Sequence, residues 1–228
     1  MFTGFTEKTG SFFWELAFNN ERPWFLEHKQ EFEDCVNTPF RELAKNSFAL
    51  MEQRFPELEC RLHIARIYRD ARRLFGRGPY KDHLWFSIKS GQILLEGPMF
   101  WFEIGAVDYS YGMGFYSATP RQMDAFRRSI DANPARFKGI AQEMERCGFR
   151  PDGEEYKRPK ALHDDKVIDR WYNRKRIGLE RRFDLGGDAF SEKLPEILVD
   201  AWAQLMPMYE YFMEIYRSCP DDRRTRNG

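Results

Sequence analysis

The segment from Arg66 to Lys81, RIYRDARRLFGRGPYK, gathers residue types that bind anions. Six cations and two tyrosines accompany one acid, Asp70, although the whole chain has a formal net charge of zero. Arginine offers a planar fork of donors, lysine a point charge and tyrosine a hydroxyl donor. Together they can hold a phosphate or a carboxylate, so the segment predicts a pocket for a small anionic ligand.

The predicted ligand-binding side chains all come from this segment: Arg66, Arg69, Asp70, Arg72, Tyr80 and Lys81. Asp70 is expected to orient Arg66 or Arg72 through a bidentate bond. Strand alternation would put Arg66 and Arg69 on opposite faces unless the strand bulges. A simpler interpretation stays open, in which the arginines are solvated and the Arg–Asp pair only stabilises a loop.

No familiar spacing identifies catalytic residues. The histidines occur in neither HExxH nor HxH, and the chain contains no GxSxG or Walker sequence. His83 follows Lys81 closely and is therefore the first general acid–base candidate, with Asp70 as the second. The four cysteines form no CxxC pair, so neither a metal site nor a cofactor is predicted. Whether the protein is an enzyme is left open.

Two other functions fit parts of the same pattern. A second basic region, residues 157–182, has ten Lys or Arg against four acids, with aromatic residues interleaved. Used together with residues 66–81, it could form a nucleic-acid-binding module, although a solvated helix face explains it as well. The third possibility is a protein-interaction domain whose aromatic surface meets a partner or a second copy of the chain.

Composition favours a soluble protein. Lys+Arg and Asp+Glu are equal at 36 each, so no global field attracts nucleic acid or an anionic membrane. No apolar run approaches the roughly 20 residues that a membrane-spanning helix needs. The start of the chain, MFTGFTEKTG, does not read as a signal peptide. A cytoplasmic protein with reduced thiols is expected.

Periodicity predicts one α+β domain over residues 1–228, in which helices flank a central antiparallel β-meander. The helical parts are expected at residues 8–56 and 119–218, the sheet at about residues 61–116, and a frayed tail at 220–228. Thr38 and Pro39 predict a helix start, as does the capping box TPRQ at Thr119. Pro207 should kink or split the last helix.

Four ordered motifs carry a resemblance to a known family: NNERPWF, RIYRDARRLFGRGPYK, GMGFYSATP and YKRPK. In this order they resemble the bacterial domain-of-unknown-function family 2461, over nearly the whole chain. One departure is Gly76, which stands where that family has an acid. The family has no assigned activity, so the resemblance implies a shared fold and an important central motif and leaves the chemistry open.

Overall fold

The computed structural model describes residues 1–70, 72, 74, 76–93 and 96–219, and the expected tail at 220–228 lies outside them. Its elements, in chain order, are α1 (Glu7–Phe18), α2 (Arg22–Glu27), α3 (Lys29–Phe32), the π-helix η1 (Glu33–Asn37), α4 (Thr38–Arg54), the 3-10 helix η2 (Pro56–Leu58), β1 (Arg61–Ile64), β2 (His83–Lys89), β3 (Pro98–Gly105), β4 (Asp108–Phe115), α5 (Pro120–Ala132), α6 (Pro134–Arg146), β5 (Arg150–Pro151), α7 (Lys166–Tyr172), β6 (Gly178–Asp184), the 3-10 helix η4 (Gly187–Phe190), α8 (Leu194–Gln204) and α9 (Met206–Ser218).

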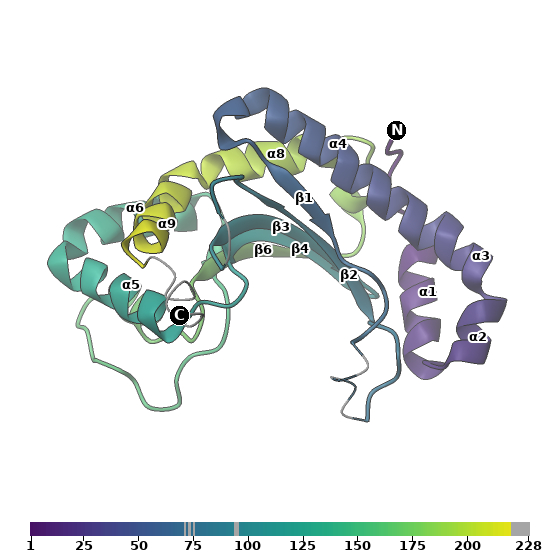
Figure 1. Cartoon of the computed structure of the whole chain (residues 1–228), viewed down its shortest axis with the longest axis horizontal. Helices are drawn as coiled ribbons and strands as arrows, with labels where there is room; N and C mark the ends of the chain where they lie inside the picture. The colour runs from purple at the N-terminus through teal and green to yellow at the C-terminus, as the bar shows by residue number, and fades with distance from the viewer. Residues whose placement is uncertain (71, 73, 75, 94–95, 220–228) are drawn as a thin grey trace, which may run out of the picture. The chain divides into compact units, whose positions relative to one another are not determined.

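The described strands form one six-stranded antiparallel sheet in the order β1-β2-β3-β4-β6-β5. The α+β class and the meander from β1 to β4 are confirmed (Figure 1). The expected limits of the sheet, residues 61–116, were too narrow, because β5 and β6 come from the region predicted as helical. The sequence of β6, GLERRFD, becomes polar after its second residue and is exposed at its end, so it lacks the apolar alternation of a half-buried strand.

The predicted helix start at Thr38 is corrected by the structure, since helical backbone continues from Lys29 to Arg54 through the π-helix η1. Pro39 has no N–H to donate to the carbonyl of Cys35, one helical turn earlier. That carbonyl instead accepts a hydrogen bond from the Thr9 hydroxyl of α1, at 2.7 Å. The wider π turn thus accommodates the proline without ending the helix.

Two other local predictions hold. The Thr119 hydroxyl accepts the backbone N–H of Gln122, and the Gln122 side chain accepts the N–H of Thr119, which is the predicted capping box. The last helix is split at Leu205 into α8 and α9, with Pro207 in the first turn of α9. Within the described residues, no helix is both long and apolar enough to cross a membrane.

Backbone contacts divide the chain into two compact units. The first holds the described residues of Met1–Gln92, Trp101–Tyr111 and Arg182–Ala201, and the second those of Ile93–Phe100, Gly112–Arg181 and Trp202–Gly228. In the first unit, α4 packs on β1 and β2. Phe40 of α4 lies against Phe86 and Phe102 of the sheet, and all three rings are buried. Burying each such ring contributes about 1.5–3 kcal/mol.

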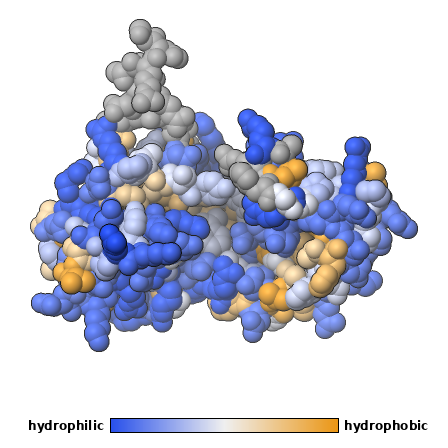
Figure 2. All heavy atoms as spheres, turned by 90° about the horizontal axis from the view of Figure 1, so that it is seen from below, coloured by the Kyte–Doolittle hydropathy of each residue, from blue (hydrophilic) through white to orange (hydrophobic). Residues whose placement is uncertain are grey.

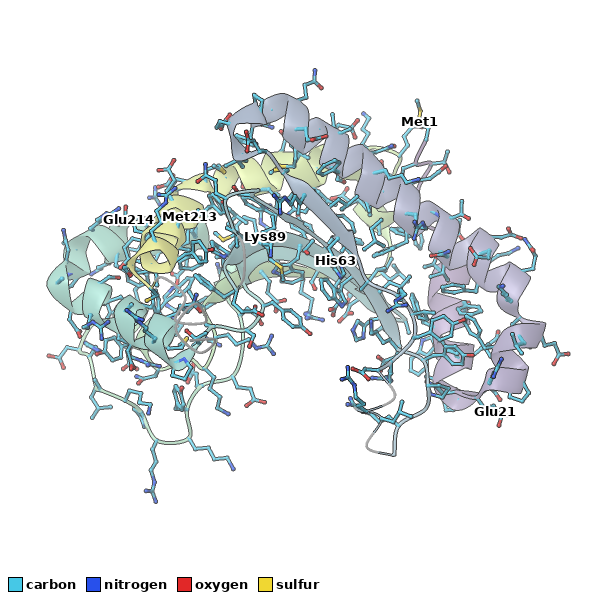
Figure 3. The ribbon with its side chains drawn as sticks, viewed as in Figure 1. Met1, Glu21, His63, Lys89, Met213 and Glu214 are labelled. Carbon is cyan, nitrogen blue, oxygen red and sulfur yellow. The ribbon has the colours of Figure 1, made fainter. Side chains whose placement is uncertain are left out.

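The second unit has its own aromatic core. Phe126 of α5 makes edge-on contacts with Phe137 of α6 and Phe212 of α9, and all three are fully buried. An ion pair joins α6 to α9, since Arg136 of α6 donates to both carboxylate oxygens of Glu214 on α9, at 2.8 and 2.6 Å. Figure 3 labels Glu214 on α9.

Glycines allow β4 and β6 to approach closely within the second unit. A Cβ at Gly112 would collide with the carbonyl of Leu179, and one at Gly114 with the backbone of Ile177 and Gly178. The GMG sequence is therefore a requirement of strand packing, because only a residue without a side chain leaves room for the neighbouring backbone.

Gly112→Ala is expected to destabilise the protein by about 1–3 kcal/mol, the usual cost of forcing extra atoms into a packed site. Gly139→Ala is the matched control, because Gly139 lies inside α6 with open space around it. The control should stabilise by roughly 0.5–1 kcal/mol, since alanine favours helix. Urea unfolding measures both, and equal effects of the two substitutions would contradict the close approach.

Candidate functional site

The cationic segment forms a narrow, irregular hairpin in the first unit. Tyr68 and Tyr80 form an isolated antiparallel bridge. The N–H of Arg69 donates to Pro79 at 2.7 Å, and the N–H of Lys81 donates to Ile67 at 2.8 Å. Between these two strands lies a loop of which Ala71, Arg73 and Phe75 are outside the described residues.

Asn20 holds this hairpin against the N-terminal helices. Its side-chain oxygen accepts the backbone N–H of Tyr80 at 2.9 Å, and its amide nitrogen donates to the carbonyl of Tyr80 at 3.0 Å. Gly78 is required beside this contact, because a Cβ there would collide with Asn20. The Asn of NNERPWF and the Gly of GPYK therefore belong to one structural unit.

Tyr80 is an anchor of the hairpin. Its ring is buried and stacks on Phe25 of α2, with ring centroids 4.1 Å apart. Burial raises the pKa of the Tyr80 hydroxyl, the nearby Tyr68 adds to the rise, and Arg22 opposes it. The phenol therefore stays protonated at neutral pH.

Arg69 and Lys81 bind the backbone of their own hairpin. Arg69 Nε donates to the carbonyl of Tyr80 at 2.7 Å, and its Nη2 lies 3.4 Å from the carboxylate of Asp82. Lys81 Nζ donates to the carbonyl of Arg66 at 2.6 Å. Burial lowers the pKa of Lys81, and the charges of Arg69 and Arg66 lower it further. Both cations thus tie one side of the hairpin to the other, and Lys81 does so at the carbonyl of Arg66.

Asp70 pairs with Arg72, one of the two partners expected for it. Arg72 Nε and Nη2 donate to the two carboxylate oxygens at 3.1 and 2.9 Å, and the Arg72 backbone N–H donates at 3.1 Å. The pair is at the surface, where the Arg72 side chain is 88% exposed. A ligand role for either residue stays a prediction.

His83 lies between two carboxylates. Its Nδ1 is 2.9 Å from Asp82 Oδ1, and its Nε2 is 3.9 Å from Glu103 Oε2. Burial alone would raise the pKa of Asp82, but the hydrogen bond with His83 and the charge of Arg69 lower it on balance. An ionised Asp82 can hold the imidazole in one tautomer. A catalytic role for His83 stays a prediction, because no substrate position is known.

A pocket of about 170 Å³ opens beside the start of the hairpin. It is lined by α2, α3, η1, α4 and the chain after β1, through Phe25, Lys29, Phe32, Glu33, Asn37, Arg41, Ala65, Arg66, Ile67 and Tyr68. Arg66 is the member of the predicted ligand set that lines it, and Arg69, Asp70, Arg72, Tyr80 and Lys81 are not among these residues. Arg66 therefore lines this pocket without Arg69. That strand alternation puts the two on opposite faces stays a prediction, because neither residue lies in a regular strand.

One helical row supplies the polar wall of this pocket: Lys29, Glu33, Asn37 and Arg41. They are spaced by four residues and therefore lie on successive turns of the same helix face. The Asn37 amide donates to Glu33 at 2.6 Å, so the single acid of the row already has a partner. This row was not predicted from the sequence, although its four-residue spacing could have revealed it.

The pocket floor is apolar. Phe25, Phe32 and Ile67 are all at most 5% exposed, whereas the ring of Tyr68 is half exposed at the rim. A charged group at the pocket mouth would therefore meet the exposed cations Lys29, Arg41 and Arg66 beside an apolar floor.

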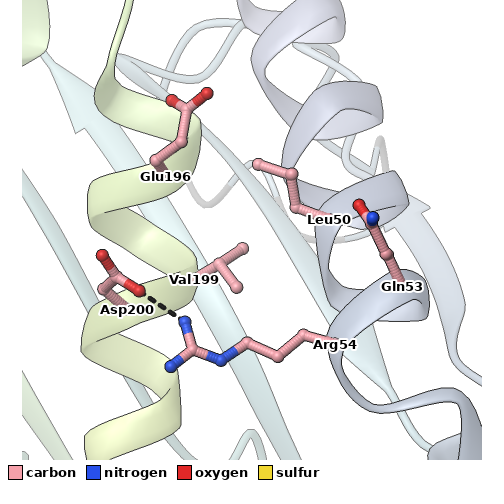
Figure 4. A pocket seen from close by; sticks show the side chains of 6 residues that line it. All are labelled: Leu50, Gln53, Arg54, Glu196, Val199 and Asp200. Carbon is pink, nitrogen blue, oxygen red and sulfur yellow. Dashed lines mark hydrogen bonds and ion pairs between the residues drawn. The ribbon is translucent and has the colours of Figure 1, made fainter.

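A second pocket, between α4 and α8, has a different electrostatic character (Figure 4). It measures about 360 Å³ and is lined by Leu50, Gln53, Arg54, Glu196, Val199 and Asp200. Arg54 forms an ion pair with Asp200, so the cation of this pocket is already neutralised. Glu196 adds a second carboxylate, so the residues that line this pocket have a net negative charge, which does not favour an anion.

Comparison with family models finds a match to the conserved hypothetical protein family DUF2461 over residues 8–211 of the 228. The chain belongs to this family. The match spans the N-terminal helices, the cationic hairpin and the whole sheet, which confirms the resemblance seen in the sequence. A search of curated proteins found no match. Membership in DUF2461 thus supports the fold and assigns no reaction.

Asn20→Ala should destabilise this DUF2461 protein by about 1–3 kcal/mol, because it leaves the buried N–H of Tyr80 without its partner. The Tyr80 carbonyl loses one of two donors and keeps the hydrogen bond from Arg69 Nε. Asn19→Ala is the matched control, since the Asn19 side chain is exposed and donates to the carbonyl of Glu15 in the helix that it follows. Chemical unfolding and hydrogen exchange at Tyr80 and Lys81 measure the effect. A loss of protection no larger than in the control would contradict the anchoring role of Asn20.

Proposed function

We propose that this DUF2461 protein binds a small anionic ligand, phosphorylated or carboxylated, in the pocket of about 170 Å³ beside Arg66. One observation carries the proposal. Cations from three separate elements, Lys29 of α3, Arg41 of α4 and Arg66 after β1, line the same pocket. Their charge exceeds that of the one acid, Glu33, which is hydrogen-bonded to Asn37.

The size of the pocket supports a small ligand group. Drug-sized ligands occupy pockets of roughly 300–1,000 Å³, so this one suits a phosphate, a short carboxylic acid or one end of a larger metabolite. The guanidinium groups of Arg41 and Arg66 can each grip two oxygens of such a group, and Lys29 adds a point charge.

The other hairpin residues of the predicted ligand set then have a supporting role in the proposal. Arg69 and Lys81 hold the backbone of the hairpin around Arg66, and Tyr80 packs on Phe25 in the pocket floor. Their charges also add to the positive potential that would attract an anion.

The face of the molecule seen in Figure 2 favours a local binding site and does not suggest a broad apolar interface. Figure 2 shows hydrophilic side chains over most of the face it presents, with apolar atoms in separate patches. We further propose that the protein acts in the bacterial cytoplasm, as its composition and its resemblance to a bacterial family lead us to expect.

Arg66→Gln should weaken binding of inorganic phosphate roughly tenfold or more, the usual effect of losing a charge-assisted hydrogen bond. The measurement is the phosphate-induced rise in Tm of the full chain at constant ionic strength, with acetate and a phosphomonoester as further probes. Arg72→Gln is the control, because it removes the same charge from the same segment at a site paired with Asp70 and outside the pocket.

Three results would count against the proposal. The wild type could gain no stability from any of the anions, or both arginine variants could lose it equally. A third contrary result is retention of full binding by Arg66→Gln together with Lys29→Gln. If Arg66→Gln alone unfolds the protein, Lys29→Gln provides the same test, because Lys29 is an exposed helical residue.

A further inference from the structure

The second unit presents an exposed cationic loop that the anion pocket does not use. The loop is the KRPK part of the YKRPK motif, in which Lys157, Arg158 and Lys160 are all exposed. None of these residues lines the pocket beside Arg66. The loop therefore raises a question of its own, independent of the proposed function.

A buried asparagine fixes both ends of this loop. The side-chain oxygen of Asn173 accepts the N–H of Lys160 at 2.7 Å and that of Ala161 at 3.4 Å, and its amide nitrogen donates to the carbonyl of Ala161 at 2.9 Å. The backbone carbonyl of Asn173 accepts the N–H of Tyr156 at 2.8 Å. Asn173 is 5% exposed, so the loop is tied to the interior of the unit.

A buried arginine, Arg127, lies beside Tyr156 at the start of the loop. Arg127 of α5, 8% exposed, donates to the carbonyls of Tyr172 and Arg174 at 3.1 and 3.3 Å. Its guanidinium carbon is 5.5 Å from the centre of the Tyr156 ring, and Lys160 Nζ is 4.8 Å from the same ring. Cation–π attraction therefore adds to the hydrogen bonds that hold the loop.

The acids next to the loop are already paired. Glu154 binds Lys175 at 2.6 Å, Glu155 binds Arg174 at 3.3 Å, and Asp152 lies 3.7 Å from Arg176. For the part of the chain that the structure describes, no ion pair joins Lys157, Arg158 or Lys160 to a carboxylate. The three loop cations therefore keep their charge available at a fixed position.

We propose that the loop of Lys157, Arg158 and Lys160 binds the phosphate backbone of nucleic acid. Two of the three cations are lysines, which are common at phosphate contacts and depleted at protein–protein interfaces. A loop that is already ordered loses little conformational entropy on binding. These contacts are made to phosphate groups and not to bases, so we expect binding to be independent of base sequence.

The test is fluorescence anisotropy of the full chain with a labelled 20-base-pair duplex between 20 and 200 mM NaCl. Each phosphate contact contributes about 0.9 to the slope of log K against log salt concentration. Replacing Lys157, Arg158 and Lys160 by glutamine should therefore lower the magnitude of the slope by about 2.7 and weaken binding at low salt. A duplex of unrelated sequence should bind equally.

The control removes three charges elsewhere, through Lys8→Gln, Lys45→Gln and Lys193→Gln, all at exposed positions. It should keep most of the wild-type slope, which separates the loop from net charge. Circular dichroism and Tm check that the loop variant folds. If it does not, the double variant Lys157→Gln/Arg158→Gln replaces it, with an expected slope change of about 1.8.

Three outcomes would overturn the proposal. The wild type could fail to bind the duplex at 20 mM NaCl, or the control could lose as much of the slope as the loop variant. Polyglutamate of matched charge could also bind the loop as tightly as DNA does, which would identify an acidic protein as the partner. Phosphate stabilisation at the Arg66 pocket is measured separately in the loop variant, so failure here leaves the proposed function unaffected.

Discussion

The Asn20 side chain forms two hydrogen bonds with the backbone of Tyr80, and the candidate site depends on them. This amide joins the turn between α1 and α2 to a hairpin about 60 residues later in the chain, and the Tyr80 ring then stacks on Phe25. The hairpin lacks a regular ladder of its own, so its position comes from these contacts. Because Arg66 leads into this hairpin, the wall of the pocket is fixed in the same way.

Charge in the site is organised by what each cation already binds. Arg69, Arg72 and Lys81 donate to carbonyls or carboxylates of their own segment, so their hydrogen bonds stabilise the fold. The contacts of Arg69 and Lys81 are partly buried and therefore costly to lose, whereas the Arg72–Asp70 pair lies at the surface and contributes little. Lys29 and Arg41, by contrast, extend from helices toward a pocket with an apolar floor. The arginine-rich segment thus contributes Arg66 to the pocket, whereas its residues Arg69, Arg72 and Lys81 bind within the hairpin.

The sequence predicted the α+β class, the strand meander, the capping box at Thr119 and the split near Pro207, because these follow from periodicity and local turn chemistry. It could not predict the π-helix, because that turn depends on a hydrogen bond from another helix, in which the Thr9 hydroxyl donates to the Cys35 carbonyl. It missed β6 because close backbone packing at Gly112 and Gly114, and not apolar alternation, decides its place in the sheet. Lys29 and Arg41 were missed because the anion-binding pattern was sought within one segment.

The most direct test of the account is a crystal of the full chain soaked in tungstate, an anomalously scattering analogue of phosphate. We expect an anomalous peak in the pocket beside Arg66, within hydrogen-bond distance of the guanidinium groups of Arg66 and Arg41. A peak bound instead by Arg69 and Lys81, or a pocket that stays empty while tungstate binds elsewhere, would contradict the claim that this pocket is the anion site.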